Sequence, residues 1–212
     1  MRPLDRRAFS LQAAALACAA AGVSPRARAQ GGPVEGRDFR ALGRPLAVPA
    51  DGKIDVVEFF WYGCPHCMAF EPSVQAWSTR LPRDVRFRRM PVAFDARREL
   101  HQRIFYTWEA LDVLEPMHEK TYARFHQQKK PVDSLADMLA FAQDNGLDPA
   151  KVESAWKSFA VQARCSEARR LADDYGIDET PAMAIGGRFV ARAQPRMLEV
   201  TDILVNELRY RR

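Results

Sequence analysis

Cysteine is scarce in this sequence: the chain has 212 residues and only four cysteines, of which Cys64 and Cys67 are close neighbours. Small secreted domains that rely on disulfide bonds for stability contain proportionally more cysteine, so the chain is not a disulfide-rich scaffold. A structural zinc site needs four ligands at matching spacing. Cys64 and Cys67 would supply two of them, but the other cysteines and most histidines are scattered along the chain. We therefore expect no bound metal and no cofactor.

Charge of one sign is also in short supply once the N-terminus is set aside. The formal net charge of the whole chain is +5, from 32 basic and 27 acidic residues. Residues 1–29 contain five arginines and one aspartate, which leaves 27 basic and 26 acidic residues in the rest of the chain. This near balance gives no support to a nucleic-acid partner, and none is expected.

No N-terminal apolar run is long and apolar enough to form a stable membrane span. The nearest candidate, residues 9–23, is rich in alanine and follows a pair of arginines. Ala27 and Ala29 place small residues at both positions that a signal peptidase reads. This pattern predicts a secretory signal peptide at residues 1–29 that is cleaved after Ala29.

The arginine pair suggests how the chain is exported. Residues 5–11, Asp-Arg-Arg-Ala-Phe-Ser-Leu, resemble a twin-arginine signal, which is read by a receptor. A general secretory signal with an incidental arginine pair remains the alternative. A lipid anchor on Cys18 is disfavoured, because Ala15 stands where a larger aliphatic residue is usual.

The two neighbouring cysteines lie where a strand pattern changes into a helix pattern. Apolar and aromatic residues run from Ile54 to Trp61, and after Cys67 the apolar positions Phe70 and Val74 have helical spacing. A Cys-x-x-Cys segment at a strand-to-helix junction is typical of a thioredoxin-like redox motif.

The position of Cys64 in this motif has a chemical consequence. Cys64 is expected at the N-cap, where unpaired backbone N–H groups and the helix dipole favour a negative charge, so its thiolate is stabilised. Pro65 suits the first helical position, because it has no N–H to leave unpaired. His66 adds a hydrogen-bond donor beside the sulfur. Cys67 lies one turn further in, so we expect it to be more buried.

A longer pattern around the cysteines resembles one family. Glu-Phe-Phe-x-x-x-Cys-Pro-His-Cys-x-x-Phe-Glu, which starts at Glu58 and ends at Glu71, is similar to the DsbA family of periplasmic thiol:disulfide oxidoreductases. The resemblance extends to Thr180-Pro181 and so covers most of the chain. It implies a thioredoxin-like α/β fold with an inserted all-helical domain, an acidic reactive cysteine, and a cis-proline at Pro181 that faces the cysteines.

The periodicity along the chain agrees with that arrangement. We expect a thioredoxin-like domain at residues 30–96 and 175–212, and an inserted helical domain at residues 97–174. Gly186-Gly187 is expected to form a hairpin turn. The expected strands cover residues 39–48, 54–61, 85–92, 183–185 and 188–190, and helices are expected after Cys64, throughout 97–174, and from Pro195 onwards.

For each candidate site residue, a structural role remains open beside the functional one. The pair Cys64–Cys67 is interpreted as a redox-active disulfide, although a structural disulfide and half of a zinc site remain open. Glu58, in an otherwise apolar strand, is either a buried acid that passes a proton to Cys67 or a carboxylate that reaches water. His66 either tunes the thiolate or is a surface histidine.

Three further residues carry expectations. Thr180-Pro181 is either the cis-proline that faces the cysteines and gives substrate backbone an edge for pairing, or an ordinary trans-proline at the end of a loop. Cys165 is interpreted as a small buried apolar residue, with a regulatory thiol as the alternative. Glu71 is expected to be a solvated helix residue with a modest electrostatic role.

The sequence therefore predicts an enzyme that introduces disulfide bonds into unfolded exported proteins with free cysteines. The resemblance implies a periplasmic location and a membrane quinone-linked partner of the DsbB kind that reoxidises the enzyme. Two alternatives stay open: a disulfide isomerase or reductase, and a redox-inert binding module of the same fold. A monomer is expected.

Overall fold

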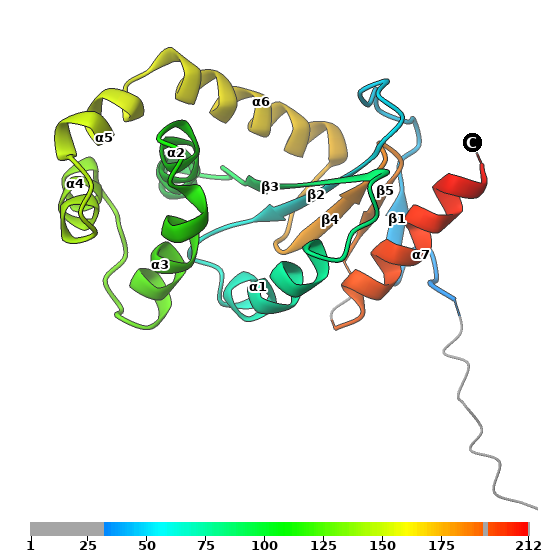
Figure 1. The fold of residues 1–212 in the computed structure, drawn as a ribbon. Coiled ribbons are helices and arrows are strands. Elements are labelled where there is room, and N and C mark those ends of the chain that lie inside the picture. Colours follow the sequence, from blue (N-terminus) through cyan, green and yellow to red (C-terminus); the bar gives the residue numbers. More distant parts are fainter. Residues whose placement is uncertain (1–31, 193–194, 212) are drawn as a thin grey trace, which may run out of the picture. The chain divides into compact units, whose positions relative to one another are not determined.

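Five strands of the chain form one mixed sheet with the order β1-β5-β4-β2-β3 (Figure 1). The computed structural model describes residues 32–192 and 195–211, so the predicted signal peptide and its cleavage after Ala29 lie outside the described residues. The central strand β2 pairs in parallel with β3 and antiparallel with β4, and β5 pairs antiparallel with both β4 and β1. The strands are β1 (Phe39–Ala41), β2 (Ile54–Phe60), β3 (Val85–Pro91), β4 (Ala182–Ile185) and β5 (Phe189–Ala191).

Five consecutive helices are inserted between β3 and β4, and one helix follows each of β2 and β5. No strand lies among the described residues between β3 and β4, and the bounds of a separate helical domain at residues 97–174 stay a prediction. The helices are α1 (Pro65–Ser78), α2 (Ala96–Ala110), α3 (Leu114–His126), α4 (Leu135–Asp144), α5 (Pro149–Trp156), α6 (Phe159–Tyr175) and α7 (Met197–Tyr210). None of them is long and apolar enough to cross a bilayer, as far as the described residues go.

Strand β2 is buried on both of its faces. Val57 and Phe59 belong to one apolar cluster, which includes residues of the inserted helices, and Ile54 and Val56 belong to a second cluster with residues of α1 and α7. Figure 1 shows α1 and α7 on the same side of the sheet. A continuous apolar run is what a strand covered on both faces requires. Full burial of each such side chain stabilises the fold by about 1.5–3 kcal/mol.

The first strand is short. Pro45 and Pro49 predict a short or marginal edge strand within residues 39–48, and β1 ends at Ala41. Beyond it, Leu42 and Leu46 still donate their backbone N–H groups to the carbonyls of Arg188 and Gly187, at 2.7 and 2.8 Å. Pro45 lies between them and has no N–H, so a regular ladder cannot continue.

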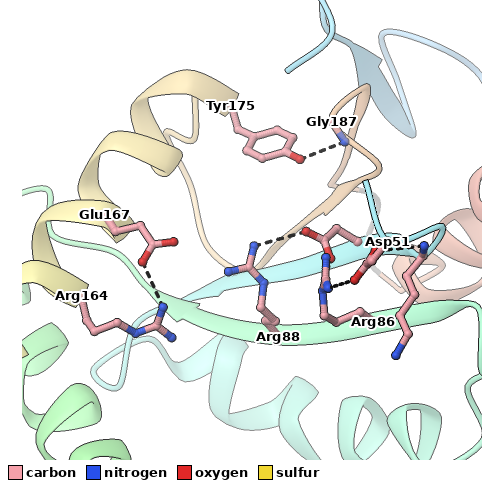
Figure 2. Close-up of polar contacts among 9 residues, drawn as sticks. Asp51, Arg86, Arg88, Arg164, Glu167, Tyr175 and Gly187 are labelled. Carbon is pink, nitrogen blue, oxygen red and sulfur yellow. Dashed lines mark hydrogen bonds and ion pairs between the residues drawn. The ribbon is translucent and has the colours of Figure 1, made fainter. Parts of the chain in front are cut away.

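The predicted hairpin turn at Gly186-Gly187 is confirmed. Both glycines have positive φ angles, of 57° and 69°, as a two-residue turn between antiparallel strands requires. A Cβ on Gly187 would come within 2.6 Å of the Leu46 carbonyl oxygen. The hydroxyl oxygen of Tyr175, at the end of α6, accepts the backbone N–H of Gly187 at 3.0 Å (Figure 2). The last inserted helix is thereby tied to the sheet.

Strand β2 carries two buried carboxyl groups, and they have different partners. Asp55 is 4% exposed and forms ion pairs with Arg86 and Arg88 of the neighbouring strand β3. Arg86 also pairs with Asp51 in the loop before β2 (Figure 2). Among the described residues, Asp55 is therefore matched by two cations, whereas Glu58, three residues further along β2, has a single long ion-pair contact.

Candidate active site

Cys64 lies at the N-cap of α1, as predicted. Its backbone is extended (φ −83°, ψ 116°), and its Sγ accepts the backbone N–H of Cys67 at 3.3 Å. Pro65 occupies the first turn, where its missing N–H leaves no donor unpaired. The sulfur therefore takes the place that a serine or aspartate oxygen takes at most helix N-termini.

The two cysteines, which are free thiols in this structure, have opposite proton affinities. A hydrogen bond from the Cys67 thiol lowers the pKa of Cys64 to about 5, and the backbone N–H groups of Cys67 and His66 contribute although burial opposes them. Burial raises the pKa of Cys67 far above its ordinary value, and the adjacent Cys64 sulfur raises it further. At neutral pH the pair therefore consists of a Cys64 thiolate and a Cys67 thiol.

Cys64 is the more accessible of the two cysteines, as expected. Cys64 is 6% exposed and Cys67 is fully buried. Cys64 Sγ is itself largely covered, because it lies against the first turn of α1 and the Thr180 carbonyl. Pro65 and His66 are exposed beside it. The structure thus places His66 at the surface, and its proposed tuning role stays a prediction.

The Thr180–Pro181 peptide bond is cis, as predicted, and it lies beside the cysteines. In its thiol form Cys64 donates from Sγ to the Thr180 carbonyl oxygen, 3.5 Å away. The two residues are 116 positions apart in the sequence. They meet because α1 follows β2, Pro181 precedes β4, and β2 and β4 are paired.

Glu58 is a buried acid and does not reach water. It is fully buried, and neither carboxyl oxygen has a hydrogen-bond partner among the described residues. Burial raises the pKa of Glu58 to about 8, Glu71 raises it further, and Arg89 opposes the shift. Its nearest ionic contact is Arg89, with Nε 3.5 Å from Oε2. Glu58 is therefore neutral at pH 7 and can supply a proton.

Glu71 is not the solvated helix residue that we expected. Its side chain is only 14% exposed, and Arg89 donates from Nη2 to its Oε1 at 2.6 Å. On its other side, His118 Nε2 lies 3.4 Å from its Oε2. Arg89 lies on β3 and His118 on α3, so neither partner could be assigned to Glu71 from the local sequence.

His101 holds Trp61, an aromatic residue shortly before the cysteines, by a hydrogen bond. Trp61 donates from its indole nitrogen to His101 Nδ1 at 2.7 Å, and the Arg98 guanidinium lies 4.4 Å from the centre of a Trp61 ring. A Cβ on Gly63 would come within 2.3 Å of the same indole. Gly63 thus leaves room for Trp61 next to Cys64. Sequence reasoning assigned His101 no role, because the contact joins residues 40 positions apart.

Cys165, the remaining candidate, is buried and unreactive in its surroundings. Cys165 is 2% exposed on α6, and burial raises its pKa to about 11, which is the environment of a small apolar residue rather than of a reactive thiol. In the described part of the chain, no group of three or more His, Cys, Asp and Glu side chains could hold a metal ion.

The sequence is similar to a known protein family and to several of its named members. A profile described as a DSBA-like thioredoxin domain matches residues 97–200. The chain is 34% identical over 179 residues to the thiol:disulfide interchange protein DsbA of Pseudomonas aeruginosa, which covers 82% of this chain and 85% of that protein. It is 37% identical over 180 residues to the protein of the same name from Bordetella parapertussis, over 85% of this chain and 84% of that protein.

Solved structures agree with the sequence matches. A crystal structure of Pseudomonas aeruginosa DsbA is similar with a TM-score of 0.79 at 33% identity, and covers 83% of this chain and 94% of that chain. The oxidoreductase DsbA of Xylella fastidiosa is similar with a TM-score of 0.77 at 30% identity, over 84% of this chain and 98% of that chain. The fold is therefore thioredoxin-like with inserted helices, as the sequence predicted.

Proposed function

We propose, given that the chain belongs to the DsbA family of thiol:disulfide interchange proteins, that Cys64 and Cys67 are its reactive pair and that it introduces disulfide bonds into exported proteins. Family membership establishes a protein disulfide oxidoreductase. We infer in addition that Cys64 and Cys67 carry the reaction and that it runs towards oxidation of the client protein.

The proposed reaction has two exchange steps. A thiolate of the client protein attacks Sγ of Cys64 in the oxidised enzyme, the Cys64–Cys67 bond breaks, and a mixed disulfide forms between client and Cys64. Cys67 leaves as a thiolate and takes up one proton. A second client thiolate then attacks the client sulfur of the mixed disulfide and releases Cys64 as a thiolate. The client loses two electrons, and the cysteine pair gains them.

The asymmetry of the two thiols supports the oxidising direction. The hydrogen bonds to Sγ, from the Cys67 thiol and from the N–H groups of the first turn, stabilise the Cys64 thiolate. Each stabilises the reduced enzyme and has no counterpart in the disulfide. A thiolate with a low pKa is also a good leaving group, which speeds release of the oxidised client.

Cys67 needs a proton donor at the moment it leaves, and Glu58 is the proposed source. Cys67 is fully buried, so its thiolate is costly without a proton. Glu58 is equally buried and holds a proton at neutral pH. Thr180 and Pro181 are proposed to complete the site, with backbone beside Cys64 that can pair with an extended client segment.

Location and partners follow from the same proposal. Residues 1–29 are proposed to direct export to the periplasm, by the twin-arginine or the general secretory route, with cleavage after Ala29. A membrane quinone-linked protein of the DsbB kind is proposed to reoxidise the pair, and the enzyme is proposed to act as a monomer. Mass spectrometry of the exported protein checks the cleavage: a chain that keeps residues 1–29 would contradict it.

The single observation that carries the proposal is the Cys64 sulfur at the N-cap of α1, where it accepts the Cys67 N–H at 3.3 Å. The test is oxidation of a reduced peptide with two cysteines by the oxidised enzyme. Cys64→Ser should abolish the reaction, and Cys67→Ser should accumulate mixed disulfides with the peptide. Cys165→Ser serves as the matched control and should leave the rate unchanged. Continued oxidation by the Cys64→Ser variant would overturn the assignment.

The direction of the reaction has its own test. Equilibration with glutathione gives the reduction potential, which should be more oxidising than that of the glutathione pool. A potential well below that of glutathione, with rapid reduction of insulin, would instead identify a reductase. Efficient refolding of a scrambled disulfide substrate would identify an isomerase.

A further inference from the structure

Four elements of the fold bring ionisable side chains together in the interior near the cysteine pair. Glu58 comes from β2, Glu71 from α1, Arg89 from β3 and His118 from α3, and Tyr62 lies in the turn between β2 and α1. Arg89 contacts both carboxyl groups, and His118 contacts both Glu71 and Tyr62. Two acids, one permanent cation and one histidine therefore share one site.

The two acids cannot both be ionised at neutral pH. Arg89 supplies a single positive charge, and its contacts are unequal: Nη2 lies 2.6 Å from Glu71, whereas Nε lies 3.5 Å from Glu58. Two buried carboxyl groups beside one cation retain one proton between them, because like charges in a low dielectric repel strongly. The question is which acid holds that proton.

Two contacts bear on the tautomer of His118. The Tyr62 hydroxyl lies 2.9 Å from Nδ1, and the hydroxyl is the donor in this contact when Nδ1 carries no hydrogen. The neutral ring then carries its hydrogen on Nε2. That atom lies 3.4 Å from Glu71 Oε2, a close polar contact, and neither atom has a hydrogen-bond partner in the described residues. With the hydrogen on Nδ1 instead, the lone pair of His118 Nε2 would face a lone pair of Glu71 Oε2, which is repulsive.

We propose that His118 is a positioning residue that holds the shared proton of the acid pair on Glu58, by presenting its Nε2–H to Glu71. The donor favours an ionised Glu71, and the charge of Glu71 in turn keeps the nearby Glu58 neutral. This inference rests on the proposed function in one respect: it explains why Glu58 is the acid that is loaded with a proton for Cys67.

The charges that surround His118 agree with this role. It faces Glu71 of α1, Arg89 of β3, Glu115 of its own helix, and the hydroxyl of Tyr62. Burial lowers the pKa of His118 although Glu71 opposes the shift, so the ring is neutral at pH 7. Burial opposes ionisation of Glu71 as well, but contacts with His118 and Arg89 hold its pKa below the ordinary value.

A cavity of about 580 Å³ between α1 and α3 gives this arrangement a route to solvent. Glu71, His118 and Tyr122 are among its lining residues, whereas Glu58 is not. Glu71 and His118 are therefore the members of the site that border this cavity, whereas Glu58 is fully buried.

The native protein itself allows the first test, so no variant has to fold. Nitrogen NMR of the reduced enzyme at pH 7 reports the tautomer of His118, and we expect hydrogen on Nε2 with an unprotonated Nδ1. Assigned carboxyl ¹³C resonances should place Glu58 at the shift of a neutral acid and Glu71 at that of a carboxylate. Hydrogen on Nδ1, or a neutral Glu71 beside an ionised Glu58, would overturn the proposal.

A pair of variants then separates positioning from packing. In His118→Gln the amide nitrogen reaches the place of Nε2 and keeps a donor for Glu71, whereas in His118→Asn the amide reaches only the place of Nδ1. The Gln variant should keep the native ¹³C shifts. In the Asn variant, the carboxyl resonance of Glu58 should move towards the shift of an ionised acid, and that of Glu71 towards the shift of a neutral acid. Mixed-disulfide formation at pH 7 should become about tenfold slower or more. Native shifts in a folded Asn variant would contradict the proposal.

The equilibrium and kinetic readouts keep the two proposals apart. The NMR measurements use reduced enzyme without a client, so they stand or fall regardless of the direction of the reaction. If the ¹³C shifts respond to His118→Asn but the enzyme does not oxidise peptides, the proposed function fails and the role of His118 stands. If oxidation is normal and the shifts do not respond, only the role of His118 fails.

Discussion

The Sγ of Cys64 accepts the backbone N–H of Cys67 at 3.3 Å, so a donor from the first turn of α1 points at the sulfur. Cys67 itself lies one turn further in and is fully buried. One thiol of the pair therefore sits where a negative charge is stabilised, and the other sits where a negative charge is costly. This difference over three residues sets the chemistry of the site, and the following predictions depend on it.

Stability should depend on pH differently in the two redox states. The pKa of Cys64 is about 5 in the folded reduced protein and near its ordinary value of about 9 in the unfolded chain. Its contribution is fully present above pH 9 and is lost as the pH falls through 5. The free energy of unfolding of the reduced form should thus rise relative to the oxidised form between about pH 5 and 9, by at most about 1.4 kcal/mol per pH unit. Denaturant titrations of both forms measure the slope, and parallel curves would contradict the prediction.

Glu58→Gln should stabilise the protein at neutral pH. The pKa of Glu58 is raised from about 4.5 to about 8, so the folded state keeps a proton that the unfolded chain has already released. Stability is therefore lost as the pH rises from about 4.5 to 8. Gln resembles the neutral acid in shape and does not titrate, so the variant should gain on the order of 3 kcal/mol at pH 7 and little at pH 4. Thermal unfolding across this pH range measures the difference.

Asp55→Asn is the matched control for that experiment, because it changes the other buried carboxyl of β2. Asp55 forms ion pairs with Arg86 and Arg88, so its loss removes the carboxylate that Arg88 contacts and one of the two that Arg86 contacts. This variant should be less stable than the native protein at pH 7, with the opposite sign to Glu58→Gln. The same sign for both variants would show that burial alone does not explain the behaviour of Glu58.

Cys165 should not react in the folded enzyme. It is 2% exposed, and burial raises its pKa to about 11, so it is neither accessible nor ionised at pH 7. Iodoacetamide should modify the reduced native protein at Cys64 only, and should reach Cys165 after denaturation. Peptide mass spectrometry locates the label. Modification of Cys165 at a rate similar to that of Cys64 would instead favour a regulatory thiol.

Gly63→Ala should displace the Trp61 indole. A Cβ at residue 63 would come within 2.3 Å of that ring, which is too close for any real contact. The shift should break the hydrogen bond from the indole to His101 and cost about 1–3 kcal/mol in stability. Trp61 fluorescence and thermal unfolding report both effects. Unchanged fluorescence and stability would mean that Trp61 is not fixed in this position.

Local sequence was enough to predict the elements and the centre of the site. The positions of Cys64 and Cys67 followed from a strand pattern that changes to helical spacing at one place, and the chemistry of the N-cap followed from that boundary. The family resemblance supplied the cis bond at Pro181. Each of these signals lies within a few residues of the feature that it predicts.

Other features depend on contacts between distant residues, which no local pattern contains. The partners of Glu71 are Arg89, 18 residues away, and His118, which lies on a different helix of the inserted block. Whether Glu58 reaches water depends on what covers β2, so sequence alone left both alternatives open.

The most direct test of the account is the titration of Cys64 in the reduced enzyme. Ultraviolet absorbance of the thiolate, measured against pH in native protein and in Cys64→Ser, isolates this one sulfur. The structure predicts a midpoint near pH 5 that disappears in the variant. A midpoint near 9, the ordinary value for a cysteine thiol, would contradict the claim that the start of α1 holds this sulfur as an anion.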